Sequence, residues 1–205
     1  MVTRASADDP ATVGRLDGVG GVFFSGGDQA RVTAAILNTA THQRLLELYR
    51  GGAVIGGTSA GAAIMSRVMI TGDERLNKDS VNAFVFIRRD NVVTTEGLGF
   101  IDDAIIDQHF AYRKRHNRLI SIVLEHPSLV GIGIDEATAL LVNPDRMLEV
   151  KGEGTVVVYD ARRASAVRTD SLGNLGGRDL RMHVLTGGER FTISPDGDPP
   201  KGKSR

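Results

Sequence analysis

Residues 57–61, G-T-S-A-G, have the residue types and spacing of a nucleophilic serine. The apolar run at 53–55 predicts a buried strand before this segment, and the small residues at 60–63 predict a helix after it. In such a G-x-S-x-G elbow the sharp turn exposes the serine hydroxyl at the carboxyl end of the strand. The N-terminus of the following helix offers N–H groups and a positive dipole to a developing oxyanion. Ser59 is therefore a candidate nucleophile, and an incidental serine in a glycine-rich turn is the plain alternative.

A serine nucleophile needs a general base, which is usually histidine. Of the five histidines, His109 is the best candidate, because D-Q-H-F at 107–110 follows a predicted buried strand. The carboxyl ends of such strands form the edge where α/β sheets bind ligands and where Ser59 should emerge. Of the other four, His42 is predicted on a polar, solvated helix, His116 on an arginine-rich surface and His126 at a helix C-terminus. His183 is predicted in a late β-type segment and remains an alternative base.

The acid that orients the base is expected from residues 131–136, G-I-G-I-D-E, another buried strand that ends in two carboxylates. Side chains alternate along a strand, so Asp135 and Glu136 should point to opposite faces. At most one of them can face His109, and this pattern does not choose between them. Ordinary turn residues at a strand end are the alternative interpretation.

The segment G-G-D-Q at 26–29 ends the first clear strand, predicted over 20–25, at the same edge of the sheet. Its backbone N–H groups could complete an oxyanion hole, and Gln29 could hydrogen-bond a substrate. A plain turn would also explain this segment.

A basic cluster, Arg113, Lys114, Arg115 and Arg118, follows His109 directly. Arg115 and Arg118 share a helix face at i,i+3 spacing. A solvated face is the usual meaning of such a run. Beside a catalytic histidine, the arginines could instead hold substrate carboxylates in bidentate fashion.

The alternation of helices and apolar strands predicts an α/β fold with a parallel sheet covered on both faces. The polar stretch 68–99 is expected to be an irregular surface excursion, and the close spacing of the last three strands indicates an antiparallel C-terminal edge. We expect a single domain over 1–194 and a disordered tail at 195–205. Helices are predicted at 30–38, 42–49 and 112–125, and the remaining strands at 104–107, 129–134, 138–142, 147–150 and 155–159.

Composition narrows the class of protein. The 205 residues contain no cysteine, which excludes disulfides and thiolate chemistry. Lys+Arg and Asp+Glu balance at 25 each, which gives no support for nucleic-acid binding. No apolar run approaches membrane-spanning length and the N-terminus lacks the apolar core of a signal peptide, so a cytoplasmic protein is expected if Met1 is the true start.

In this order, the segments at 26–29, 57–63, 107–110 and 131–136, with the arginine trio Arg113, Arg115 and Arg118, resemble the cyanophycinases. The resemblance covers nearly the whole chain and includes a similar segment near the C-terminus, H-V-L-x-x-G-x-x-F at 183–191. The elbow alone would fit many relatives, whereas the ordered set with D-Q-H-F and the arginines is far more specific.

The resemblance implies an exo-acting serine peptidase that cleaves cyanophycin, an arginine-branched poly-aspartate, into β-Asp-Arg dipeptides. It implies a three-layer fold similar to class I glutamine amidotransferases, with a mainly parallel central sheet, a homodimer, and no metal or organic cofactor. It maps the catalytic triad onto Ser59, His109 and Glu136, and so favours Glu136 over Asp135. The oxyanion donors are then expected at Gly27, Asp28 and Ala60, and the substrate-binding positions at Gln29, Asp107, Gln108, Arg113, Arg115 and Arg118.

One departure from the family is expected to matter. Members of the family begin with further strands and helices, whereas this chain resembles them from the helix before G-G-D-Q onward. We expect a truncated start that leaves an unpaired, apolar strand edge. The alternatives are a different hydrolase, such as an esterase that uses Ser59, Glu136 and His183, and a truncated homologue without activity.

Overall fold

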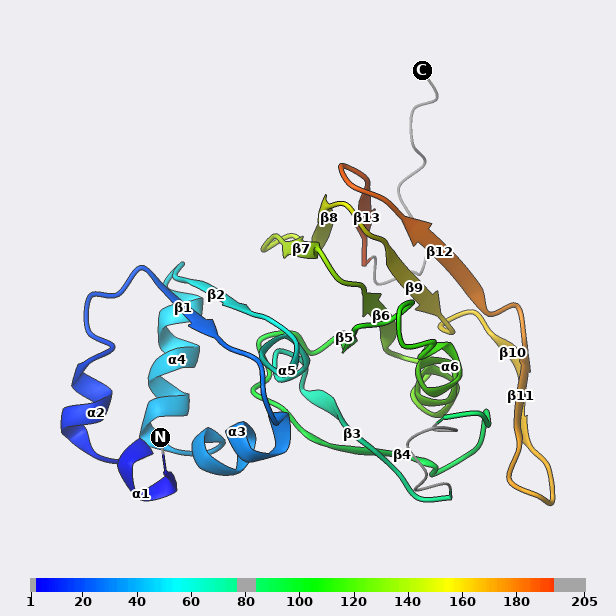
Figure 1. Ribbon diagram of the computed structural model, residues 1–205, viewed down its shortest axis with the longest axis horizontal. Coiled ribbons are helices and arrows are strands. Elements are labelled where there is room, and N and C mark those ends of the chain that lie inside the picture. The colour runs from blue at the N-terminus through cyan, green and yellow to red at the C-terminus, as the bar shows by residue number, and fades with distance from the viewer. Residues whose placement is uncertain (1–2, 77–83, 194–205) are drawn as a thin grey trace. The chain divides into compact units, whose positions relative to one another are not determined.

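The computed structural model describes residues 3–76 and 84–193. The chain divides into two compact units, one of Met1–Thr71 with Thr94–Asp102 and one of Gly72–Val93 with Asp103–Arg205 (Figure 1). Strands β3 (Val68–Glu74) and β4 (Val92–Glu96) pair with each other in a two-stranded sheet, and the division between the units falls within both strands.

The first unit holds a two-stranded parallel sheet of β1 (Gly21–Phe24) and β2 (Val54–Gly57). Helix α5 (Ala60–Ala63) contacts both strands. The other helices of this unit are α1 (Arg4–Ala7), α2 (Pro10–Gly14), α3 (Gln29–Ile36) and α4 (Ala40–Arg50).

Local sequence explains the bounds of the two longer helices of this unit. The Asp28 carboxylate accepts the Arg31 N–H at the start of α3, and the Thr39 hydroxyl accepts the His42 N–H at the start of α4. Gly52, at φ +96°, follows the last residues of α4 and takes a conformation that L side chains rarely adopt. The chain thereby turns into β2.

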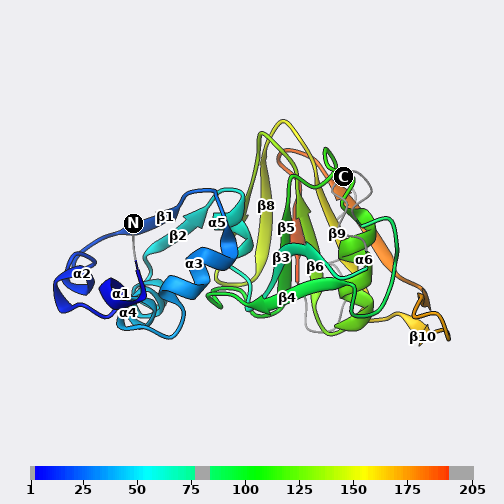
Figure 2. The same ribbon diagram turned by 60° about the horizontal axis from the view of Figure 1, so that its bottom comes forward.

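The second unit contains the larger sheet, in the order β12–β9–β6–β5. Strands β5 (Ala104–Gln108) and β6 (Val130–Ile134) are parallel, whereas β9 (Val156–Asp160) and β12 (Arg181–Leu185) are antiparallel to their neighbours. Helix α6 (His116–Glu125) contacts β6 and β9 (Figure 2). A second sheet of this unit contains β7 (Thr138–Val142), β8 (Met147–Gly152) and β13 (Arg190–Thr192). Strands β10 (Ser165–Thr169) and β11 (Leu175–Arg178) form a separate hairpin.

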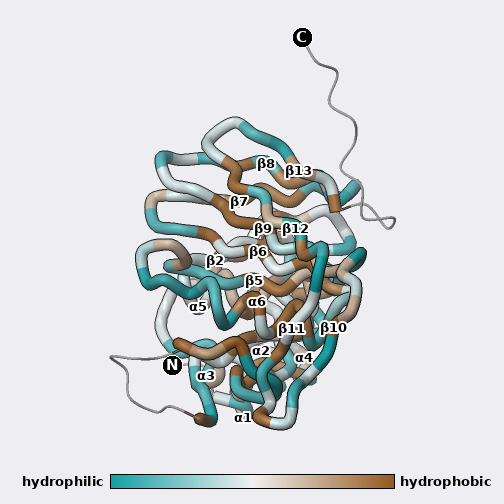
Figure 3. Tube along the Cα trace, turned by 90° about the vertical axis from the view of Figure 1, so that its right-hand side faces the viewer, coloured by the Kyte–Doolittle hydropathy of each residue, from teal (hydrophilic) through white to brown (hydrophobic). Residues whose placement is uncertain are grey.

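The core of the second unit lies between α6 and β6. A Cβ on Gly131 would come within 2.6 Å of Val123 and 2.9 Å of Leu119, both on α6, so the absent side chain lets the helix lie close to the strand. Every residue of β9 is buried, and its apolar character is visible as brown in Figure 3. Tight packing on this face fixes the ends of β5 and β6, which carry site residues.

The predicted strands of both units are confirmed to within about two residues, and so are the helices that became α3 and α4. The prediction for 68–99 is wrong at β3 and β4, where Met69 and Ile70 are buried. Helix α6 begins at His116 rather than at Tyr112, because 110–115 form a loop that turns back by the Arg115 N–H bond to Phe110 O. The β-type segment expected around His183 is β12, whereas β10, β11 and β13 were not predicted as separate elements.

The fold is mixed α/β, as expected, with parallel pairs in both units. The three-layer arrangement and the single domain over 1–194 stay predictions, and the predicted tail at 195–205 lies outside the described residues. Among the residues that the structure describes, no helix has the length and apolar character needed to cross a membrane.

Candidate active site

Ser59 sits in a strained turn between β2 and α5. Its backbone has φ +54° and ψ −116°, a region that non-glycine residues rarely enter. Such strain is concentrated at functional positions, where it aims a side chain that a relaxed turn would bury. The geometry is therefore that of the elbow predicted from the motif.

The two glycines of the motif are required by contact rather than by composition. A Cβ on Gly57 would lie 2.2 Å from the Gly61 carbonyl oxygen, and one on Gly61 would lie 2.2 Å from that of Phe24. Both distances are far shorter than any real contact, so strand, turn and helix can approach only because the side chains are absent.

The G-G-D-Q loop lies beside the serine within the first unit. A Cβ built on Gly26 would be 3.3 Å from the Ser59 Cβ and 3.8 Å from its Oγ. Gly27, at φ +134°, takes a conformation reserved for glycine, and the loop then enters α3 through its cap, Asp28. Ala60 is the first residue of α5, where a backbone N–H has no partner within the helix. Amides from two segments thus border the Ser59 turn.

Gln29 is buried and its orientation is set by two carbonyls. Its Nε2 donates to Ile70 O at 3.1 Å and to Thr71 O at 2.7 Å. Because both donors of the amide are used, the Oε1 atom is the group left to accept a hydrogen bond.

His109 and Glu136 meet in the second unit. His109 directly follows β5, and Glu136 lies two residues after the end of β6. The last residues of these two strands, Gln108 in β5 and Ile134 in β6, are partners in the parallel register. The His109 Nδ1 and the Glu136 Oε1 are 2.7 Å apart. The imidazole keeps 28% of its surface accessible, so it is oriented but open to a reactant.

The charge on Glu136 determines the histidine tautomer. The pKa of Glu136 is lowered to about 2, first by its interaction with the neighbouring Asp135 side chain and then by the hydrogen bond and charge of His109. An ionised carboxylate can only accept, so Nδ1 of His109 carries the proton and donates it. The Nε2 atom then holds the lone pair that a general base needs.

Asp135 has a different role from Glu136. Its Oδ1 accepts the Tyr112 N–H at 3.1 Å, which ties the end of β6 to the loop after His109. Of the two carboxylates that the strand pattern left open, Glu136 is therefore the one in contact with the imidazole.

Asp107 and Arg118 bind each other. The Arg118 Nε donates to Asp107 Oδ2 at 2.7 Å and its Nη2 contacts Oδ1, with both side chains at most 2% exposed. The sequence pattern placed both residues near the site but carried no indication of this pairing.

Arg115 contacts the neighbouring glutamine. Its Nη1 donates to Gln108 O at 2.5 Å and to Gln108 Oε1 at 3.2 Å. The Gln108 amide is thereby oriented with its Nε2 donors directed away from Arg115. Burial and then the nearby charge of Arg118 lower the pKa of Arg115 to about 10, so it remains charged at neutral pH. Arg113 is exposed.

Two of the other histidines differ from expectation. His42 is buried, not solvated: its Nδ1 accepts the Asn38 N–H at 3.1 Å, so its Nε2 donates to Leu98 O at 2.9 Å. His116 packs edge-on against Phe110 with its Nδ1 2.9 Å from the Tyr159 hydroxyl, instead of lying on an open surface. Helical and loop context alone could not reveal these long-range partners.

The last two histidines lie where the sequence places them. His126 caps the C-terminus of α6. His183 is in β12, with its ring centroid 5.1 Å from that of Phe191.

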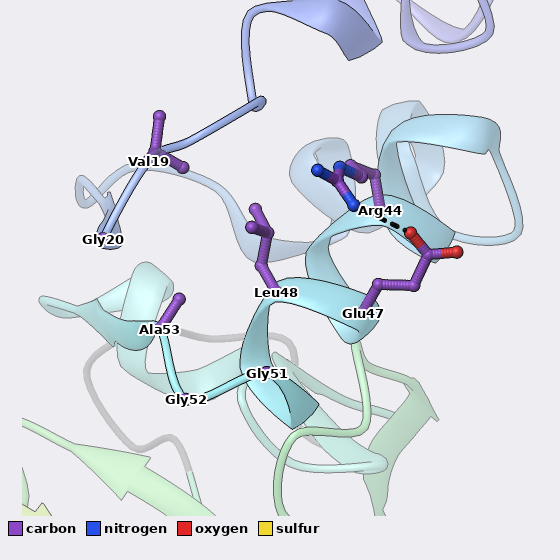
Figure 4. Close-up of a pocket in the computed structure, with 8 residues that line it drawn as sticks. All are labelled: Val19, Gly20, Arg44, Glu47, Leu48, Gly51, Gly52 and Ala53. Atoms are coloured by element: carbon purple, nitrogen blue, oxygen red, sulfur yellow. Dashed lines mark hydrogen bonds and ion pairs between the residues drawn. The ribbon is translucent and has the colours of Figure 1, made fainter.

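A cavity of about 380 Å³ in the first unit lies away from the elbow. It borders the amino ends of β1 and β2, whereas Ser59 follows the carboxyl end of β2. The cavity is lined by Val19, Gly20, Arg44, Glu47, Leu48, Gly51, Gly52 and Ala53 (Figure 4).

Across residues 3–76 and 84–193, no three His, Asp or Glu side chains gather as metal ligands would.

Comparison with known proteins agrees with this geometry. The family model of peptidase family S51 matches residues 3–150. The chain belongs to peptidase family S51. The matched region includes the elbow, the His109–Glu136 pair and the arginines that follow His109.

Within family S51, curated relatives named cyanophycinase are similar to this chain. It is 35% identical over 197 residues to that of Synechococcus elongatus, which covers 93% of this chain and 58% of the relative. It is 36% identical to that of Nostoc sp., with 93% and 62% covered. The chain thus spans about 60% of the length of these relatives.

A solved peptidase from an acI-B1 actinobacterium has a similar fold, with a TM-score of 0.62 and 24% identity. The alignment covers 93% of this chain and 66% of that one. At this identity the likeness shows the fold alone.

Proposed function

We propose that this chain carries the catalytic apparatus of a serine peptidase that hydrolyses cyanophycin to β-Asp-Arg dipeptides. The observation that carries the proposal is the 2.7 Å contact between the His109 Nδ1 and a Glu136 carboxylate that stays ionised. This contact orients an imidazole base, and the strained elbow of family S51 supplies a serine.

In the proposed reaction, the Nε2 of His109 takes the proton of the Ser59 hydroxyl as Oγ attacks the scissile amide carbon. The resulting oxyanion would accept hydrogen bonds from the Ala60 N–H and from an amide of Gly27 or Asp28. His109 then gives its proton to the departing nitrogen, leaving an ester on Ser59. Water, deprotonated by the same imidazole, releases the acid and restores the serine.

Substrate recognition in this proposal follows the donors and acceptors of the site. Arg113 and Arg115 offer fixed positive charge, and Gln108 offers amide N–H donors, which suit the carboxylates of an aspartate backbone. The free Oε1 of Gln29 is an acceptor, which suits a guanidinium or amide N–H of the arginine branch.

We further propose the three-layer arrangement of class I glutamine amidotransferases for the intact fold, and a homodimer as the assembly. The parallel pairs β1–β2 and β5–β6 support the first point, because each presents a site residue after a carboxyl strand end.

The nucleophile is tested with a fluorophosphonate probe. Wild-type protein should be labelled, and Ser59→Ala should not, because only an activated serine reacts. A folded, monodisperse wild-type sample that resists labelling would support the alternative of an inactive homologue.

The base is tested by comparing His109→Ala with His183→Ala. His109→Ala should lower kcat for cyanophycin by at least ~10³-fold, since the base is then lost. His183→Ala should leave kcat within about 3-fold, because the Glu136 carboxylate is already engaged by His109. The reverse result would favour the esterase order Ser59, Glu136, His183.

A further inference from the structure

The Asp107–Arg118 ion pair is sealed inside the second unit. Both side chains are at most 2% exposed, and the Arg118 guanidinium donates hydrogen bonds to both carboxylate oxygens of Asp107. The Phe84 ring covers the Arg118 Cζ at 4.8 Å, and Arg118 Nη1 is buried with no hydrogen-bond partner. A substrate carboxylate or guanidinium cannot reach a pair so enclosed without opening the packing around it.

The same pair is linked by backbone contacts to His109. Asp107 lies two residues before it, and the Asp107 Oδ1 also accepts the Gln108 N–H at 2.8 Å. The Gln108 carbonyl, which belongs to the peptide that enters His109, accepts from Arg115 at 2.5 Å. The backbone N–H of Gln108 is therefore bound by the Asp107 carboxylate, and its backbone C=O by the Arg115 guanidinium.

His109 needs such support because its own backbone is strained. It has φ +50°, in the left-handed region that non-glycine residues rarely adopt. The residue remains there only if its neighbours hold the chain on both sides. Asp107 supplies this hold before His109, and Arg118 anchors Asp107 to the first turn of α6.

We propose that Asp107 and Arg118 are positioning residues that hold the His109 imidazole in line with Glu136, and that they do not contact substrate. This inference deepens the proposed function and rests on it, since it assigns His109 as the base. It narrows substrate recognition within this unit to Gln108, Arg113 and Arg115.

The test uses the paired variant Asp107→Asn with Arg118→Met, which removes both charges of the enclosed pair together, while Arg115, 3.8 Å from Asp107, keeps its charge. Steady-state kinetics with cyanophycin should show kcat lowered by about 10²-fold, the usual result of a misplaced catalytic group, with KM within about 3-fold. Substrate contacts would instead raise KM more than they lower kcat. That result, or unchanged kcat and KM, would overturn the proposal.

A second measurement does not depend on activity. The proton shared by His109 Nδ1 and Glu136 should give a downfield proton NMR signal, identified by its loss in His109→Ala. The signal should be present in wild type and weakened or lost in the paired variant. If wild type hydrolyses nothing but the signal behaves in this way, the proposed function fails and the positioning role stands. An unchanged signal in the folded variant would contradict positioning whatever the activity.

The matched control is the Asp160–Arg162 pair, which has the same fork geometry, with both contacts at 2.9 Å. Asp160 pairs with Val130, at the opposite end of β6 from Glu136. Asp160→Asn with Arg162→Met should leave kcat and the signal as in wild type. If the Asp107/Arg118 variant does not fold, Arg118→Lys is measured in its place: a partial loss of kcat supports the proposal, and an unchanged kcat overturns it.

Discussion

At the scale of single residues, the site depends on a carboxylate that is hard to protonate. The pKa of Glu136 is about 2, below its ordinary value of 4.5, because of its interaction with the Asp135 side chain and of the hydrogen bond and charge of His109. Glu136 is thus ionised through the range in which a peptidase is assayed. It can hold the Nδ1 proton of His109 at every pH above about 4.

We expect the acid side of the pH profile of kcat/KM between pH 4 and 8 to show a single protonation, with no contribution from Glu136. Glu136→Gln should lower kcat by roughly 10²–10⁴-fold, since a neutral amide holds the wrong tautomer as readily as the right one. A profile with a second protonation near pH 4.5, lost in Glu136→Gln, would contradict the assignment.

The same shift predicts how stability depends on pH. A carboxyl whose pKa is lower in the folded state stabilises the fold above its unfolded pKa and loses this contribution as pH falls toward the folded pKa. The difference in urea midpoint between wild type and Glu136→Gln should therefore be largest above about pH 5 and shrink toward pH 2.5. A difference that grows on acidification would show that the interaction has the opposite sign.

At the scale of elements, the loop that contains His109 packs against β6 through the Phe110 side chain. The Phe110 ring is fully buried, and a Cβ on Gly133 would lie 2.2 Å from it. Gly131, on the same face of the strand, admits α6 in the same way. Two glycines of G-I-G-I-D-E therefore determine how closely the His109 loop and helix α6 approach the strand that precedes Glu136.

Gly133→Ala should destabilise the protein by about 1–3 kcal/mol, the usual cost of overpacking, and should lower kcat because Phe110 must move. Urea unfolding followed by circular dichroism measures the first effect. Gly176→Ala is the control, since a Cβ there meets no atom closer than 3.9 Å, and it should change stability by less than about 0.5 kcal/mol. Equal effects of the two substitutions would show that the Phe110 contact is not limiting.

At the scale of the whole molecule, the β1–β2 sheet presents an apolar face. Phe23 and Val54 are 70% and 73% exposed, although parallel strands are usually covered on both faces. In the register of this sheet Gly21 pairs with Val54 and Phe23 with Gly56, so both apolar side chains share one face.

We expect this face to limit solubility. Phe23→Thr with Val54→Thr should reduce concentration-dependent association measured by light scattering, because the exposed apolar area falls. Leu172→Ser, at an exposed leucine in the turn between β10 and β11, is the control and should change little. Association unchanged by the double substitution would exclude this face as its cause.

The chemistry of the site was predictable from short segments. G-T-S-A-G encodes its own turn, because only glycine fits at 57 and 61, and D-Q-H-F and G-I-G-I-D-E each follow an apolar run long enough to be a strand. Local sterics and hydrophobic periodicity act over a few residues, so the sequence alone determined the elbow, the candidate base and the parallel strands that present them.

Tertiary structure decided which side chains meet. Glu136 rather than Asp135 contacts His109, Asp107 is enclosed with Arg118, and His42 is buried against Leu98. These outcomes depend on partners that lie 11 to 56 residues apart along the chain and on the direction in which each side chain leaves its strand or helix. Residue type and spacing do not specify those directions, whereas close packing of the whole unit does.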